Sequence, residues 1–226
     1  MLRFYFNLSP NPTKVALFLE EAGLTYQPVP IDTRKGEQFT PDFLAINPNG
    51  KVPAIDDGGV IVFDSNAILL YLAEKTGMFL PRPESRGALL SWLMFVASGV
   101  GPFSGQAVHF KHFAPEKIAY AHNRYQYEAM RHYAVLDGHL AHHRYMVDDN
   151  YSIVDMDVWG WARMIPFILG EEAWTKLPNL KRLHDEVAAR PAVARALELK
   201  NKFTFKTEMD DEARRHHFKH LALQVA

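Results

Sequence analysis

The spacing of hydrophobic residues changes near residue 80. Up to that point, short runs of β-branched and aromatic residues alternate with segments of helical periodicity. Beyond it the strand signals end, and apolar residues recur only at helical spacing. The sequence therefore predicts an α/β domain followed by an all-helical domain. The predicted strands cover residues 2–6, 26–31, 52–55 and 60–63.

Turn residues and caps place three helices among these strands. The first is expected to have Asn11 as its N-cap, Pro12 as its first residue and Gly23 as its stop. The second lies near residues 41–46, and the third is capped by Asp64 and Ser65 and ended by Gly77. Together with the strands, these helices give the order βαβ, loop, ββ, α.

Proline and glycine refine the predicted sheet. The strand over 26–31 contains prolines, which cannot donate to a ladder, so we expect it at an edge. Residues 57–59 (Asp-Gly-Gly) lie between two β-prone runs and predict a hairpin. Pro53 falls inside an apolar run, which a cis peptide bond would explain. That bond would turn the backbone of Val52 outward, where it can pair with a peptide ligand.

The second half of the chain is predicted to be helical. Residues 80–83 (Leu-Pro-Arg-Pro) are the best candidate for a linker, and Ser152 with Asp155 matches a capping box. The histidine-rich tail is either a helical extension over the active site or a frayed end. The expected divisions are an α/β domain over 1–80, a linker over 81–86, a helical domain over 87–205 and a tail over 206–226. The expected helices cover 86–97, 116–144, 155–169, 179–189 and 192–200.

Composition limits the classes of function. The chain has 226 residues, of which 48% are hydrophobic, and this suits a globular protein with a sizeable core. A formal net charge of -1 gives no electrostatic attraction to nucleic acid or to an anionic membrane. There is no cysteine, which excludes disulfides and a cysteine nucleophile and fits a reducing compartment. We find no signal peptide and no window near the roughly 20 apolar residues of a membrane span, so we expect a soluble cytoplasmic protein.

Two helix N-termini in the first domain carry small polar residues. One follows Ser9 and Asn11, and the other follows Asp64 and Ser65. Helix N-termini present unpaired N–H groups and about half a positive charge, which suits a carboxylate or a thiolate. Local capping explains each of these residues on its own equally well. In this order, on either side of Pro53, the combination is a specific signal.

These segments resemble the cytosolic glutathione transferases. Residues 47–55 followed by 64–72 are similar to the glutathione-binding half of that family, and 152–155 match the capping box of its second domain. The resemblance extends from residue 2 to about residue 200 and implies a thioredoxin-like fold for the first domain. A narrower resemblance, to the bacterial nu class and its relative, the yeast prion protein Ure2, lies in residues 9–11, 35–39, 101–106 and 124–126.

The resemblance implies a role for each matching residue. Asp64 would pair with the amino group at the γ-glutamyl end of glutathione, and Ser65 would hold the carboxylate there. The backbone of Val52, before the cis-proline, would pair with the cysteinyl unit. Lys51 and Gln38 would reach the glycyl carboxylate.

The sulfur of glutathione would receive hydrogen bonds from Ser9 and Asn11. Together with the helix dipole, these bonds would favour the thiolate near pH 7. The five-residue spacing from Ser9 to Lys14 is the one found in the nu class, and it leaves the main sulfur ligand open between Ser9 and Asn11. Tyr5 is an alternative familiar from animal transferases, but as a strand residue we expect it to pack in the core.

Three residues of the helical domain are candidates for a second glutathione or for a substrate pocket: Gln106, His109 and Arg131. Arg131 stands where nu-like chains have an arginine and would meet a second glutathione carboxylate, with a surface salt bridge as the alternative. The chain has 11 histidines but no cysteine and no carboxylate at metalloprotease spacing, so we expect no metal.

The resemblance thus implies a homodimeric enzyme that uses glutathione as a co-substrate with a small electrophile or a disulfide. Because the chain lacks cysteine, disulfide exchange must run through the sulfur of glutathione itself, and we favour the disulfide-bond reductase activity of the nu class. Conjugation to electrophiles and reduction of organic hydroperoxides are alternatives that use the same thiolate. A non-catalytic glutathione-binding regulatory protein, as among Ure2 relatives, is the second hypothesis.

Overall fold

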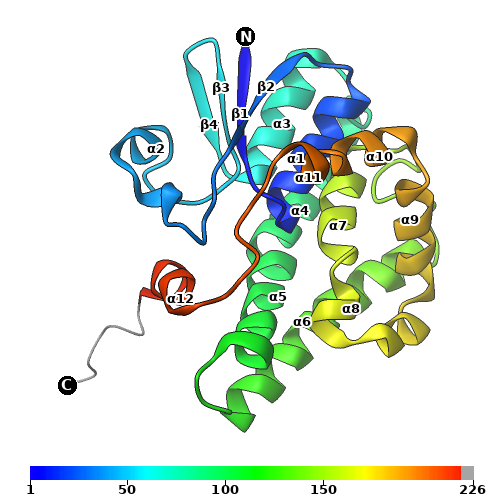
Figure 1. Cartoon of the computed structure of the whole chain (residues 1–226). Coiled ribbons are helices and arrows are strands. Elements are labelled where there is room, and N and C mark those ends of the chain that lie inside the picture. The colour runs from blue at the N-terminus through cyan, green and yellow to red at the C-terminus, as the bar shows by residue number, and fades with distance from the viewer. Residues whose placement is uncertain (220–226) are drawn as a thin grey trace. The chain divides into compact units, whose positions relative to one another are not determined.

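The computed structural model describes residues 1–219 (Figure 1). Contacts divide the chain into two compact units: Met1–Tyr71 together with Ala194–Ala226, and Leu72–Val193. The first unit therefore takes its residues from both ends of the chain. The domain limits expected at residues 80 and 205 stay predictions.

A four-stranded sheet forms the centre of the first unit, as predicted. β1 runs parallel to β2 and antiparallel to β3, and β3 and β4 form the predicted hairpin. β2 lies at the edge, where its prolines remove no donor from an inner ladder. The strands are β1 (Leu2–Phe6), β2 (Tyr26–Pro30), β3 (Ala54–Asp57) and β4 (Val60–Phe63), in the order β2-β1-β3-β4.

β3 begins later than predicted. The peptide bond between Val52 and Pro53 is cis, as expected, and the ladder with β1 starts only at Ala54, opposite Tyr5. The Tyr5 side chain is buried in a cluster with Phe43 and neighbouring apolar groups. This confirms the core role expected for Tyr5.

The helices of the first unit match the predictions except at one cap. α1 (Pro10–Glu21) has Ser9 as its N-cap, so the assignment of Asn11 to that position was wrong. Pro10 suits the first helical position as well as Pro12 does, because neither needs an N–H there and both hold φ near the helical value. The other two helices are α2 (Pro41–Ile46) and α3 (Ser65–Thr76).

The second unit is helical, as predicted, with two differences in detail. The expected helix over 155–169 is interrupted after Ala162, because Pro166 in the first turn of α8 cannot continue the hydrogen bonds of α7. α5 has no counterpart among the expected helices, since it opens on Gly101 and Pro102, which are poor interior helix residues. The helices are α4 (Arg86–Phe95), α5 (Gly101–Val108), α6 (Ala119–Leu140), α7 (Ile153–Ala162), α8 (Ile165–Leu169) and α9 (Pro178–Ala188).

α4 and α5 belong to one continuous helical run, Pro83–Phe113, that contains π-helical turns at Val96–Val100 and His109–Phe113. By length and composition alone this run is able to cross a membrane, so the expectation that no window comes near that length was wrong. A core helix of a soluble protein meets the same criterion, which makes a single such helix weak evidence for a membrane span.

The capping box predicted at the start of α7 is present. The Ser152 hydroxyl accepts the Val154 N–H over 3.3 Å, and the Asp155 carboxylate accepts the Ser152 N–H over 2.8 Å. Asp155 also accepts the N–H of Met146 over 2.8 Å. Burial raises the pKa of Asp155 to about 7, against the lowering effect of these hydrogen bonds. Both carboxylate oxygens of Asp155 thus accept hydrogen bonds inside the fold. We call this N-terminus of α7 closed, because its capping groups are not available to a ligand.

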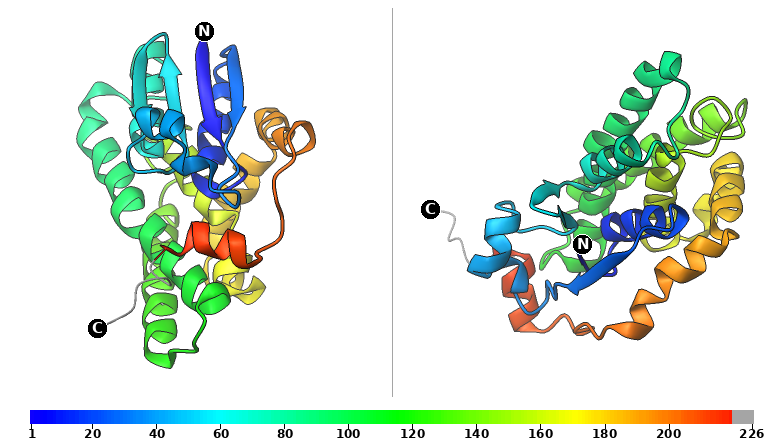
Figure 2. Two further views of the ribbon diagram at one scale, coloured as in Figure 1. Left: turned by 60° about the vertical axis from the view of Figure 1, so that its left-hand side comes forward. Right: turned by 90° about the horizontal axis from the view of Figure 1, so that it is seen from above.

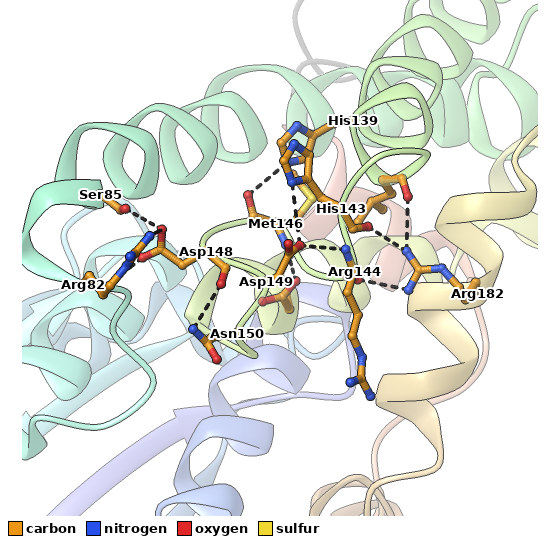
Figure 3. A network of polar contacts seen from close by, with 12 residues as sticks. Arg82, Ser85, His139, His143, Arg144, Met146, Asp148, Asp149, Asn150 and Arg182 are labelled. Atoms are coloured by element: carbon orange, nitrogen blue, oxygen red, sulfur yellow. Dashed lines mark hydrogen bonds and ion pairs between the residues drawn. The ribbon is translucent and has the colours of Figure 1, made fainter.

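Charged side chains fasten the turn between α6 and α7 (Figure 3). Asp148 accepts hydrogen bonds from the Arg82 guanidinium over 3.0 Å and from the Ser85 hydroxyl over 2.5 Å. These partners lower the pKa of Asp148 to about 2. Arg182 donates to backbone carbonyls of the same turn, and the His139 ring lies 3.0 Å from another. The polar groups of this region hold the backbone in place.

The chain returns to the first unit through α10 (Pro191–Leu197) and α11 (Leu199–Lys202). The rings of Phe203 and Phe205 then pack edge-on against Phe6, with centroids 5.4 and 5.8 Å apart. A last helix, α12 (Asp211–His217), lies beside residues 36–39 (Figure 2). The helical alternative for the tail is therefore correct over residues 211–217, and residues 220–226 lie outside the described part.

Candidate functional site

Ser9 stands at the open end of α1. Its hydroxyl donates to Asn7 Oδ1 over 2.6 Å, and its backbone N–H donates to the same oxygen over 3.0 Å. Asn7 in turn donates to the Thr33 hydroxyl over 3.2 Å. Asn7 therefore orients the exposed Ser9 side chain. It was not among the predicted site residues, although a polar residue directly after a strand is a usable signal for a site at the end of a sheet.

The first turn of α1 retains a single free backbone donor. Pro10 and Pro12 have no N–H, and the Thr13 N–H is bonded to the Ser9 carbonyl over 3.2 Å. The remaining N–H belongs to Asn11, whose side chain forms no hydrogen bond with residues 1–219. The positive end of the helix dipole thus carries a hydroxyl, an amide and one N–H that an anion can use.

Residues 51–53 form an extended segment with an unused backbone. The buried side chain of Asn47 donates to the Lys51 carbonyl over 2.6 Å and accepts the Asn49 N–H over 3.0 Å, which fixes the preceding turn. Val52 follows, with its N–H and carbonyl unbonded to any part of the described chain. An extended peptide can therefore pair with Val52 as an added strand would.

Asp64 and Ser65 open α3. Asp64 adopts a left-handed φ of 71°, which aspartate tolerates better than most residues. Its Oδ1 accepts the N–H groups of Asn66 and Ala67 over 2.9 and 3.2 Å, so the predicted cap is confirmed. Oδ2 has no hydrogen bond within residues 1–219 and points to no internal partner, which leaves it for an ammonium group.

A buried lysine connects the ends of α1 and α3. Lys14 is 1% exposed, and its Nζ donates to Asn66 Oδ1 over 2.8 Å. The Ser65 hydroxyl donates to the same oxygen over 3.2 Å. A positive charge held in the interior behind both helix N-termini adds to the positive potential that an anion meets there. In the sequence, only the spacing from Ser9 singles out Lys14.

Gln38 is buried with half of its amide unused. Its Nε2 donates to the Thr33 carbonyl over 3.1 Å, whereas Oε1 has no partner in the described chain. A buried polar atom without a hydrogen bond costs about 1–3 kcal/mol, so Gln38 gains from a ligand that contacts it. The unused end is the amide oxygen, an acceptor; for Gln38 to donate to a ligand, its amide must turn over and give up the bond to the Thr33 carbonyl.

The N-terminus of α1, Gln38 and residues 51–52 line a cavity of about 440 Å³, within the range of about 300–1,000 Å³ usual for small-molecule sites. Three residues of the C-terminal segment complete its wall: His216, His217 and Lys219. They were not predicted as site residues, although the histidine-rich tail was considered as a cover for the site. Five predicted residues line the cavity: Ser9, Asn11, Gln38, Lys51 and Val52.

Three further predicted residues lie outside the lining. Pro53 is buried directly after Val52. Asp64 and Ser65 belong to the end of α3, to which Lys14 connects. The structure therefore gathers the residues proposed for the sulfur and for the glycyl end in one cavity, and places those proposed for the γ-glutamyl end at a second helix N-terminus of the same unit.

The remaining candidates belong to the second unit, and their roles stay predictions. Arg131 donates from Nε to Glu128 over 2.9 Å, so the surface ion pair considered as the alternative is present. Gln106 is exposed, and the His109 ring meets that of Phe110 edge-on at 5.0 Å. Within residues 1–219, no three His, Asp or Glu side chains form a group able to hold a metal ion.

Comparison with known families gives two matches. A model of the glutathione S-transferase N-terminal domain matches residues 2–74, and a model of the C-terminal domain matches residues 106–200. The disulfide-bond oxidoreductase YfcG of Escherichia coli is 43% identical over 212 residues, which cover 87% of this chain and 94% of that protein. The disulfide-bond oxidoreductase YghU of the same species is 39% identical over 213 residues, which cover 86% of this chain and 73% of YghU.

Solved structures agree. A glutathione transferase from Burkholderia graminis, with two glutathione molecules bound per subunit, superposes with a TM-score of 0.83 at 35% identity, covering 89% of each chain. Ure2p in complex with glutathione gives a TM-score of 0.81 at 31% identity, covering 86% of this chain and 97% of that one.

Proposed function

The chain belongs to the glutathione transferase family, in its nu-like, Ure2-related type, and from this we propose that it is a glutathione-dependent disulfide-bond reductase. One observation carries the proposal. The free donors at the end of α1 and the unpaired backbone of Val52 share a cavity large enough for a tripeptide. A site of this kind can hold an extended peptide and an anionic sulfur at once.

We assign the site residues as follows. The Val52 backbone pairs with the cysteinyl unit of glutathione. Lys51 meets the glycyl carboxylate together with Gln38, whose amide turns over to present Nε2 to it. Asp64 and Ser65 bind the γ-glutamyl end, with the free Asp64 oxygen on the ammonium group. This placement directs the sulfur to the N-terminus of α1.

Ser9 and Asn11 then stabilise the thiolate. The Asn11 amide is free to donate, whereas the Ser9 hydroxyl must first release Asn7 Oδ1. The buried charge of Lys14 and the dipole of α1 act in the same direction, because both favour the ionised sulfur. Asn11 is therefore the readier donor, and Ser9 the second.

The reaction proceeds in two exchanges. The thiolate of bound glutathione attacks one sulfur of a disulfide, so that its S–S bond breaks, a mixed disulfide forms and one thiolate leaves and takes up a proton. A second glutathione thiolate attacks the glutathione sulfur of the mixed disulfide. Oxidised glutathione and the second thiol are released, and the two glutathiones have supplied two electrons.

The relatives support this chemistry over conjugation. Two of them carry the name disulfide-bond oxidoreductase, and the Burkholderia structure holds two glutathiones per subunit, as the second exchange requires. For the second glutathione we propose Arg131, with Gln106 and His109 as further residues of that pocket. We also propose a homodimer in the cytoplasm, supported by the family and by the lack of cysteine.

The test is a set of three assays on the purified protein. Reduction of hydroxyethyl disulfide is followed through glutathione reductase and NADPH, beside conjugation of chlorodinitrobenzene and reduction of cumene hydroperoxide. We expect the first activity to be the strongest. Stronger conjugation would favour the transferase alternative, and a stronger peroxidase rate would favour the hydroperoxide alternative.

Glutathione binding without any of the three activities would instead favour a regulatory protein.

Ser65→Ala should weaken retention on immobilised glutathione about tenfold, because it removes a carboxylate donor. The matched control is Ser91→Ala, which changes an exposed serine whose hydroxyl donates only to the Gly87 carbonyl of its own helix.

A further inference from the structure

The segment after α11 is held against the first unit by several independent contacts. Besides the aromatic packing of Phe203 and Phe205, the Lys206 N–H donates to Asp32 Oδ2 over 2.7 Å. Arg34 returns a hydrogen bond to the Lys206 carbonyl over 2.7 Å. Backbone and side chain are therefore both engaged, and residues 203–219, which we call the C-terminal strap, have a defined path.

α12 is anchored at both of its ends. Asp210 caps it by accepting the Ala213 N–H over 2.9 Å, and Lys206 Nζ pairs with Asp210 over 2.8 Å. At the other end, the ring of His216 covers Gly36 so closely that a Cβ there would lie 2.6 Å from it. Lys219 Nζ sits 3.2 Å above the Phe39 ring centroid, in a cation–π contact.

The strap brings positive charge to one side of the cavity. His217 lies near Arg34 and Lys51, and His216 is beside it in the chain. Asp32 is the negative group that faces this cluster, and it is already engaged by Lys206 and Lys35. Desolvation of the ring and the charges of Arg34 and Lys51 lower the pKa of His217, and Asp32 offsets part of this effect.

We propose that the C-terminal strap is part of the glutathione site, and that His217 binds the glycyl carboxylate together with Lys51. This inference rests on the proposed function, since it needs glutathione in the cavity. The γ-glutamyl end is assigned to α3, so an extended glutathione brings its second carboxylate to the Lys51 side, where His217 completes the wall. His217 is exposed, so solvent screens the contact and its effect is moderate.

The first test separates the glycyl end from the rest of the ligand. Isothermal titration of the full chain compares S-methylglutathione with S-methyl-γ-glutamylcysteine, which lacks the glycine. His217→Ala should weaken S-methylglutathione about 3- to 10-fold and leave the shorter ligand unchanged. His142→Ala, an exposed histidine of the second unit, serves as the control and should alter neither.

The pH dependence gives a second readout of the same contact. A carboxylate beside His217 raises the pKa of its ring above the lowered value in the free protein, so binding takes up a proton and tightens as the pH falls toward that lower pKa. The affinity gain between pH 8 and pH 6 should therefore be about threefold larger for the unaltered chain than for His217→Ala. An equal gain in both proteins overturns the assignment of His217.

The third test displaces the strap and leaves its residues in place. Gly36→Ala puts a Cβ into the His216 ring at a φ of +80°, and Gly58→Ala introduces the same left-handed strain at φ +63° with nothing within 4 Å. Only Gly36→Ala should weaken S-methylglutathione. If Gly36→Ala and His217→Ala both bind it normally, the strap proposal is wrong; if the unaltered chain binds neither ligand, the proposed function itself has failed.

Discussion

Two of the N-cap serines in this protein, Ser9 of α1 and Ser152 of α7, are used in opposite ways. Ser152 caps α7 through its hydroxyl, and Asp155 closes the box from the other side. Ser9 caps α1 by position only, since its side chain makes no cap hydrogen bond. The difference lies in the partner of each hydroxyl. Ser152 Oγ accepts the Val154 N–H two residues on, whereas Ser9 Oγ donates to Asn7 Oδ1. At α1 the N–H two residues on, that of Asn11, therefore stays unused, and the third position is Pro12, which has none.

The comparison shows how one motif serves stability in one place and binding in another. A hydroxyl that accepts an N–H of its own helix uses up that donor, whereas the Ser9 hydroxyl is held by Asn7 and leaves the Asn11 N–H for a ligand. Pro10 and Pro12 also remove donors that would otherwise need partners, so the end of α1 stays open without a row of unsatisfied N–H groups. The two prolines therefore lower the number of exposed N–H groups at the N-terminus of α1, which we call the open end.

The largest effect is expected at the closed end. Asp155→Ala leaves the buried N–H groups of Met146 and Ser152 without acceptors, so we expect a loss of about 3 kcal/mol in the free energy of unfolding. Urea unfolding measures it, and titration with S-methylglutathione should show unchanged affinity. Glu171→Ala, an exposed acidic residue, is the control. A loss below about 1 kcal/mol in the free energy of unfolding would show that the capping box contributes little to the stability of α7.

At the open end, the expected loss is one of activity. The double variant Ser9→Ala, Asn11→Ala removes both side-chain donors to the sulfur and should lower kcat/KM for hydroxyethyl disulfide about 30- to 100-fold, or about 2–2.7 kcal/mol. Its free energy of unfolding should stay within about 0.5 kcal/mol of the parent. Equal losses in stability and activity would mean that Ser9, like Ser152, mainly stabilises the fold.

Ser152→Ala tests the cap hydroxyl alone. It removes the acceptor of the Val154 N–H while Asp155 keeps the other half of the box, so we expect a loss of about 1 kcal/mol in the free energy of unfolding. Glutathione turnover should not change at saturating substrate. A kinetic effect without a stability effect would contradict the structural role of this serine.

The smallest expected effect is that of replacing the prolines of α1, and it tests most directly why Ser9 and Ser152 differ. Pro12→Ala restores an N–H within reach of the Ser9 oxygen, and Pro10→Ala restores one at the first helical position, which an N-cap side chain does not reach. Both lose the same proline stiffness, at about 0.5–1 kcal/mol. Pro12→Ala alone should lower kcat/KM, by about two- to threefold, since its Ser9 is drawn to the cap. Equal rates for the two variants would count against this explanation.

Local chemistry made much of the first unit predictable. Prolines placed β2 at an edge, the Asp-Gly-Gly turn gave the hairpin, and the misplaced Pro53 indicated the cis bond. The choice between Ser9 and Asn11 as the cap failed because two prolines fit the same position. Periodicity also missed α5, whose opening Gly101 and Pro102 are tolerated because α4 leads directly into it.

The partners of the site residues were not predictable in the same way. Nothing in the pattern shows that Asn7 orients Ser9, or that Lys14 reaches Asn66 across 52 positions of sequence. The contacts of the C-terminal strap were still harder to predict from the sequence. Its histidines were visible, but their contact with Gly36 joins segments 180 positions apart, and only the folded chain brings them together.

The strap has a consequence for how the protein is made. Residues 1–71 leave the ribosome before the second unit, and the residues from 194 onward that complete their unit leave after it. A chain released early can form the sheet and still lack His217 and Lys219 at the cavity wall. Under the strap proposal, retention on immobilised glutathione would then distinguish chains that extend through residue 219 from chains that stop before α12.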